Sequence, residues 1–113
     1  MVEKRKFTRV GIKSVAEMIF PNDEFEQAYV GGISRGGLEM YTQIEMIPGQ
    51  THTVRLHFLF QGEERTETVE GKIKWSASFK NAFISGMEFT KELNAADHTH
   101  LLRFIGQAEA FYK

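Results

Sequence analysis

Residues 51–60, THTVRLHFLF, alternate between polar and apolar side chains, and this period of two constrains the fold more than any other feature. Val54, Leu56 and Phe58 fall on one side of an extended backbone, with polar residues between them. Such alternation is typical of a strand that turns one face toward a hydrophobic core. The stretch therefore predicts a half-buried strand.

Five further stretches show the same alternation at least in part, and short turn signals separate them. The turn signals are Pro21-Asn22, the glycine cluster 31–37, Pro48-Gly49 and Gln61-Gly62. The expected strands cover residues 10–20, 24–33, 38–47, 51–60, 65–79 and 81–90. Six short strands with regular turns favour a closed antiparallel β-barrel, because closure leaves no exposed strand edge. The expected fold class is therefore mainly β.

Residues 94–113 change from the strand period to a helical one. Leu101, Phe104 and Ile105 recur at the spacing of one helix face. Asn94 can cap the start of this helix. We expect one amphipathic helix over about residues 94–112, packed on the barrel. Since 113 residues suit one domain, barrel and helix form a single unit over residues 10–113.

Residues 1–13 form a basic N-terminal arm. The arm holds five cations and one carboxylate, a local charge of +4 that leaves −5 on the rest of a chain whose net charge is −1. This balance favours a small anionic ligand over a nucleic-acid polymer, which needs a broad basic face. The chain has no cysteine, no signal peptide and no apolar run near the ~20 residues of a membrane helix. We expect a cytoplasmic chain without membrane insertion.

Residues 32–36 match the G-x-S-x-G pattern of the serine hydrolase nucleophile elbow, which makes Ser34 a candidate nucleophile. That chemistry requires a strand-to-helix turn in a larger α/β fold, and no helical period follows Gly37. The cluster also lacks the features of a phosphate-binding loop or a dinucleotide site. His98 and His100 lie two apart on the expected helix, so we expect solvated side chains rather than metal ligands.

Two motifs in this order resemble the PilZ-domain family. Arg5-x-x-x-Arg9 matches the R-x-x-x-R of the family, and Gly32-x-Ser34-x-x-Gly37 stands in the place of its D/N-x-S-x-x-G turn. The later segments GKIKW and SGMEF look like the closing strands of the family, so the resemblance covers nearly the whole chain. It implies a six-stranded antiparallel PilZ-type β-barrel with a C-terminal α-helix. It also implies a receptor that binds cyclic di-GMP, a bacterial second messenger, and that is not an enzyme.

The basic arm supplies half of the expected ligand contacts. Cyclic di-GMP carries two phosphodiester charges and two guanines, and a guanidinium group can pair with guanine O6 and N7, clasp a phosphate or stack on a purine. We therefore assign Arg5 and Arg9 to guanine and phosphate contacts. Lys4 and Lys6 add attraction that salt screens. Ordering of the arm over the ligand is expected to signal to an unidentified protein partner.

The glycine loop supplies the other half. Ser34 offers a hydroxyl, and Gly36 and Gly37 permit a positive φ and close approach of backbone N–H groups to the ligand. Arg35 can reach a phosphate although it is not a motif position. Trp75, the single tryptophan, has two interpretations, because it can stack on a guanine or pack against the barrel.

Gly32 is a site position that departs from the family pattern. The family carries Asp or Asn there, whose side chain can accept a hydrogen bond from the guanine edge. Losing such a contact costs about 1.5–3 kcal/mol, or roughly ten- to a hundredfold in affinity. An alternative is therefore a degenerate PilZ domain without nucleotide binding that acts as a protein–protein interaction module, which the aromatic tail EAFYK also suits. An RNA-binding barrel is disfavoured by the net charge of residues 14–113.

Overall fold

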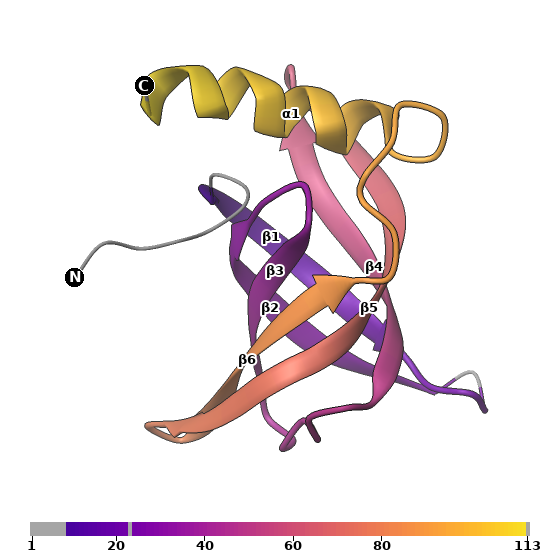
Figure 1. Cartoon of the computed structure of the whole chain (residues 1–113), viewed down its shortest axis with the longest axis vertical. Coiled ribbons are helices and arrows are strands. Elements are labelled where there is room, and N and C mark those ends of the chain that lie inside the picture. Colours follow the sequence, from indigo (N-terminus) through magenta and orange to yellow (C-terminus); the bar gives the residue numbers. More distant parts are fainter. Residues whose placement is uncertain (1–8, 23, 113) are drawn as a thin grey trace.

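The computed structural model of the chain describes residues 9–22 and 24–112. This part contains six strands and one α-helix (Figure 1). The strands are β1 (Val10–Ile19), β2 (Phe25–Ile33), β3 (Gly37–Thr42), β4 (Thr51–Phe60), β5 (Glu63–Phe79) and β6 (Ala82–Phe89). The helix α1 (Thr99–Glu109) continues into a short 3-10 turn, Ala110–Tyr112.

The strands close into a ring in the order β1-β2-β3-β6-β5-β4. Every neighbouring pair is antiparallel, and β1 closes the ring by pairing with both β2 and β4. The described part of the sheet therefore has no open edge along which another strand would add freely. The expected six-stranded antiparallel barrel with a C-terminal helix is confirmed.

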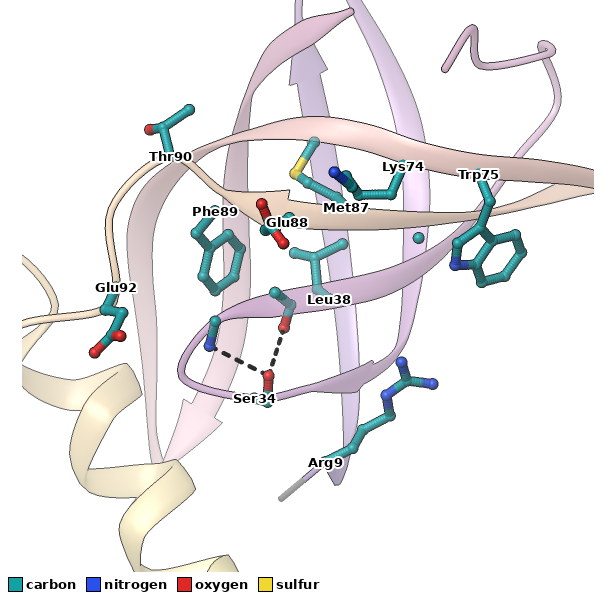
Figure 2. A pocket seen from close by; sticks show the side chains of 13 residues that line it. Arg9, Ser34, Leu38, Lys74, Trp75, Met87, Glu88, Phe89, Thr90 and Glu92 are labelled. Carbon is teal, nitrogen blue, oxygen red and sulfur yellow. Dashed lines mark hydrogen bonds between the residues drawn. The ribbon is translucent and has the colours of Figure 1, made fainter. Parts of the chain in front are cut away.

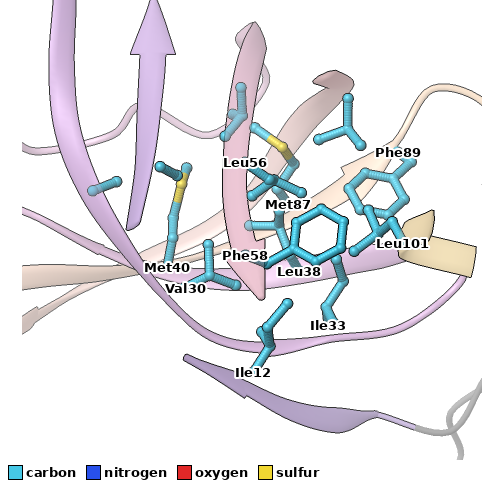
Figure 3. Close-up of a cluster of buried hydrophobic side chains, with 14 of the residues drawn as sticks. Ile12, Val30, Ile33, Leu38, Met40, Leu56, Phe58, Met87, Phe89 and Leu101 are labelled. Carbon is cyan, nitrogen blue, oxygen red and sulfur yellow. The ribbon is translucent and has the colours of Figure 1, made fainter. Parts of the chain in front are cut away.

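Apolar side chains at alternate strand positions fill the inside of the barrel (Figure 3). In β4, Val54, Leu56 and Phe58 are buried, as the alternation predicts. Leu101 of α1 enters the same cluster from the end of the barrel. Full burial of one such side chain stabilises the fold by about 1.5–3 kcal/mol, so this cluster is the main source of stability.

The β4–β5 connection agrees with the prediction from the sequence, whereas the end of β3 differs from it. Gln61 and Gly62, with φ values of 55° and 78°, form the short hairpin turn between β4 and β5 that the sequence predicts. The predicted strand over residues 38–47 is shorter in the structure, because β3 ends at Thr42. The Thr42 hydroxyl donates to the Ile44 carbonyl at 2.6 Å, and this local bond replaces pairing in the sheet.

The C-terminal helix begins at Thr99 and not near residue 94, so its predicted start was wrong. Asn94 does act as a cap, but it caps a separate turn. Its side-chain oxygen accepts from the backbone N–H groups of Ala96 and Asp97 at 3.1 and 2.9 Å. Asn94 is therefore a cap, as the sequence predicts, but it caps the turn that precedes α1.

A carboxylate from the sheet accepts hydrogen bonds from the first turn of α1. Glu67 of β5 accepts from the backbone N–H groups of His100 and Leu101 at 2.9 and 3.0 Å. The same carboxylate lies 3.1 Å from the His100 ring Nδ1, and the His98 ring lies 3.0 Å from the Thr68 carbonyl. Both histidines are half-buried and bonded to β5, so the expectation of solvated side chains was wrong. A negative charge at a helix N-terminus is stabilising, and Glu67 thus sets where α1 docks.

Helix α1 lies across one end of the barrel (Figure 1). Leu101 and Ile105 are fully buried, and the ring of Phe104 packs edge-on against Phe58 with centroids 6.3 Å apart. The helical apolar face read from the sequence is therefore the face that closes the barrel.

Candidate functional site

A cavity of about 500 Å³ lies beside the turn between β2 and β3 (Figure 2). Of the residues predicted for the site, Arg9, Ser34, Gly36, Gly37 and Trp75 line this cavity. They come from the residue just before β1, from the β2–β3 turn and the first residue of β3, and from β5. The fold thus brings together residues that are far apart in the sequence.

The remaining predicted residues stand elsewhere. Gly32 and Arg35 are not among the residues that line the cavity. Lys4 and Arg5, like Lys6, lie outside the described residues. Arg35 donates to the Glu109 carboxylate of α1 at 2.9 Å, and its expected reach toward a phosphate is replaced in this structure by that ion pair.

Ser34 organises the turn through its hydroxyl (Figure 2). The Gly36 backbone N–H donates to the Ser34 Oγ at 3.2 Å, and that Oγ lies 3.4 Å from the Gly37 carbonyl oxygen. The Ser34 backbone N–H donates to the same carbonyl at 2.8 Å. The printed partners of this hydroxyl are backbone groups, and no histidine is among the described residues that line the cavity. A serine held in this way is a turn residue, which agrees with rejecting the nucleophile elbow.

The turn is also bonded to the strand beside it. The Phe89 N–H donates to the Gly36 carbonyl at 2.8 Å, and the Leu93 N–H donates to the Arg35 carbonyl at 3.1 Å. These bonds fix the loop against the end of β6, so the cavity wall is preformed.

Gly37 is required by a close approach and not by its φ. Gly36 and Gly37 would permit a positive φ, but neither adopts one in the structure. A Cβ on Gly37 would instead collide with the Met87 carbonyl oxygen of β6 and lie 3.4 Å from the Glu88 Cα. The absent side chain lets β3 lie tightly against β6 at the edge of the cavity.

One row of residues crosses five neighbouring strands next to the cavity. In order from β1 to β5 by way of β2, β3 and β6, the row consists of Gly11, Gly32, Glu39, Gly86 and Trp75. Register shifts interrupt three of the strand pairs beside it, after Gly11 in β1, before Gly32 in β2 and before Trp75 in β5. Bulges of this kind bend strands and re-aim side chains, and they are frequent next to binding sites.

Arg9 lies over the glycine that departs from the family motif. A Cβ on Gly32 would lie 2.9 Å from the Arg9 Cδ and 3.1 Å from its Cγ, so the arginine stem covers this residue. Beyond Gly32 the guanidinium Nη1 donates to the Glu39 Oε2 at 2.7 Å. Gly32 therefore acts through its lack of a side chain, which leaves room for Arg9.

Trp75 covers Gly86, the third glycine of the row. A Cβ on Gly86 would collide with the Trp75 indole, so the ring packs closely against Gly86. The tryptophan is nevertheless 41% exposed and lines the cavity. Both sequence interpretations are therefore compatible, since one face packs on the barrel and the remainder can meet a ligand.

Several residues that line the cavity belong to no motif that would identify them from the sequence. The charged groups that line the described cavity are Arg9, Lys74, Glu88 and Glu92, two cations and two carboxylates. The three residues other than Arg9 lie in an alternating strand or the loop after it, a pattern that solvent-exposed strands share. The charged groups of the described wall therefore balance one another.

Two absences bear on the kind of site. No group of three or more histidine, aspartate or glutamate side chains in the described part of the chain could hold a metal ion. Among the same residues, no helix is long and apolar enough to span a membrane.

Comparison with known proteins agrees with the fold. The sequence model of a family described as PilZ domain matches residues 3–107. The structure superposes on the PilZ domain of YcgR from Escherichia coli with cyclic di-GMP at a TM-score of 0.68 and 10% identity, covering 97% of this chain and 95% of that one. A search of curated proteins by sequence found no match.

Two longer proteins share the same fold. The inhibitor of motility MotI/DgrA from Bacillus subtilis has a TM-score of 0.76 at 13% identity, with 94% of this chain and 52% of that chain covered. The K. pneumonia MrkH complex with cyclic di-GMP has a TM-score of 0.65 at 14% identity, with 94% and 52% covered. The chain thus spans about half the length of these two proteins.

Proposed function

Because the chain belongs to the PilZ domain family, we propose that it is a receptor domain that binds cyclic di-GMP in the cavity beside the β2–β3 turn. One observation carries this proposal. Arg9 from the R-x-x-x-R motif is far in sequence from the second motif, yet it lines the same cavity as Ser34, Gly36 and Gly37. The ligand in the cited YcgR and MrkH structures is cyclic di-GMP.

Each part of the cavity matches a part of this ligand. The Arg9 guanidinium can clasp a phosphate or pair with guanine O6 and N7, and the exposed portion of Trp75 offers a surface for base stacking. The preformed turn around Ser34 adds a rigid wall. Arg5 and Lys4 of the arm, together with Gly36 and Gly37, complete the set of residues that we assign to binding.

The charge of the cavity suggests how binding is signalled. Since the described wall holds as many carboxylates as cations, a ligand with two negative charges needs the cations of residues 4–6. The arm then closes over the ligand, and its new position is read by a protein partner in the cytoplasm. The domain acts as a receptor and not as an enzyme, because none of the residues we assign forms a nucleophile and base pair.

The two arginines provide the test. We expect replacement of Arg5 and Arg9 by alanine to weaken cyclic di-GMP binding at least a hundredfold, since each removes a charge-assisted contact worth roughly 1.5–3 kcal/mol. Isothermal titration calorimetry on the wild type and the double variant measures this. Arg103→Ala on the exposed side of α1 is the matched control and should bind as the wild type does. Equal affinity of the double variant would contradict the assignment.

A second candidate function rests on two observations. Gly32 removes the side chain that the family uses toward the ligand, and Phe111 beyond α1 is 88% exposed. Both suit an interaction module without a nucleotide. A wild-type chain that releases no heat with cyclic di-GMP, yet forms a stable complex with a cellular protein through Phe111, would favour it.

A further inference from the structure

We propose that Glu39 supplies, from β3, the carboxylate that the family motif carries on β2 at position 32, and that it selects guanine at this site. The inference rests on the proposed function. The inference adds to the proposed function the residue that recognises the edge of the base, and it explains why Gly32 is tolerated.

The register of the sheet places the two positions together. Gly32 of β2 stands directly opposite Glu39 of β3. Residues directly opposite in an antiparallel pair point to the same face, with Cβ positions about 4.5–5.5 Å apart. A glutamate side chain is long enough to cover that distance, and its carboxylate reaches the guanidinium of the Arg9 side chain that covers Gly32.

The carboxylate is held in place from one side by Arg9. The ion pair between the Arg9 Nη1 and the Glu39 Oε2 is 2.7 Å long, and the two side chains are 31% and 22% exposed. Partial burial and a short distance strengthen such a charge-assisted bond. The pair exists because the Arg9 stem crosses Gly32, where a Cβ would lie 2.9 Å from the Arg9 Cδ. Gly32 and Glu39 are thus two parts of one arrangement.

On the other side of Glu39, the same row of residues leads to the tryptophan. Gly86 stands opposite Glu39 on β6, and the Trp75 indole covers Gly86. Glu39 is not itself among the residues that line the cavity, but its partner Arg9 and the Trp75 of the same row both line it. A base stacked on the ring can direct its edge toward Glu39.

This setting distinguishes guanine from adenine. The guanine edge carries two adjacent donors, N1–H and N2–H, which a carboxylate can accept in parallel, whereas adenine presents the unprotonated N1 at that position. A carboxylate opposite an acceptor is repelled and left without a partner. Glu39 thus contributes attraction to one base and repulsion to the other.

The test moves the carboxylate back to β2. Calorimetric titrations with cyclic di-GMP and cyclic di-AMP compare the wild type, Glu39→Gln, the double variant Gly32→Asp/Glu39→Gln, and the exposed control Glu64→Gln. We expect Glu39→Gln to lose at least tenfold in cyclic di-GMP affinity and part of its preference over cyclic di-AMP. In the double variant the flexible Arg9 stem has to shift away from the new side chain at position 32, and most of the affinity and the preference should return. The control should equal the wild type. Thermal melts of each variant verify that the barrel is folded.

The outcomes separate this inference from the proposed function. If the wild type does not bind cyclic di-GMP, the proposed function fails and the role of Glu39 fails with it. If the wild type binds and Glu39→Gln binds equally well, the receptor stands and Glu39 is only structural. Tighter binding by Glu39→Gln would overturn the inference as well, because the ion pair would then compete with the ligand for Arg9. Loss in Glu39→Gln without recovery in the double variant would overturn the claim that Glu39 takes the role of the carboxylate at position 32.

Discussion

Replacing Gly37 by alanine is expected to lower the free energy of unfolding by about 2–3 kcal/mol, with a drop in Tm of roughly 10 °C. A Cβ at this position would collide with the Met87 carbonyl oxygen and lie 3.3 Å from the carbonyl carbon. Backbone atoms in a paired strand cannot rotate away as a side chain can. The alanine would therefore push β3 away from β6 and open the cavity wall, so ligand binding should be lost together with stability. Thermal unfolding followed by circular dichroism measures the first effect.

Gly106 provides a matched control for the same substitution. It lies in α1, and a Cβ there would have nothing within 4 Å. Gly106→Ala should raise stability by up to about 1 kcal/mol, because alanine is the better helix former. An unchanged Tm for Gly37→Ala would contradict the close approach between β3 and β6.

Replacing Glu67 by alanine should cost about 3 kcal/mol and release the start of α1. The change leaves the N–H groups of His100 and Leu101 without their acceptor, and hydrogen bonds to a charged group contribute roughly 1.5–3 kcal/mol each. The buried Leu101 and Ile105 would then be held less firmly. Urea denaturation measures the stability, and hydrogen exchange of the α1 amides measures the local opening.

The neighbouring glutamate on the same strand isolates the role of the carboxylate. Glu64 of β5 is exposed, and Glu64→Ala should change stability by less than about 0.5 kcal/mol. Glu67→Gln retains one acceptor oxygen and should fall between wild type and Glu67→Ala. Equal stability of Glu67→Ala and Glu64→Ala would mean that α1 docks through its apolar face alone.

The sequence predicts those parts of the fold that depend on local patterns. Alternation places Val54, Leu56 and Phe58 in the core, and Gln61-Gly62 predicts the hairpin, because period and turn chemistry involve residues close in the chain. The predicted start of α1 was wrong, because the first turn of the helix is hydrogen-bonded to Glu67, which is far away in the sequence. No local pattern distinguishes that glutamate from its exposed neighbours in β5.

In the candidate site, too, local motifs are predictable from the sequence and long-range contacts are not. Motif spacing identifies Arg9, Ser34 and Gly37, and the structure brings them to one cavity. The compensation for Gly32 could not be predicted, since it depends on the register that puts Glu39 opposite this glycine. Register is a property of paired strands, and one bulge changes it.

The most direct measurement of the central claim uses the single tryptophan of the unmodified chain. Trp75 lines the cavity and is partly exposed, so a guanine that stacks on it should change its fluorescence. Titration with cyclic di-GMP should give a saturable change in Trp75 emission at micromolar concentrations, and cyclic di-AMP and GTP should give much weaker responses. No saturable response to cyclic di-GMP, together with no heat in a parallel calorimetric titration, would contradict the assignment of this domain as its receptor.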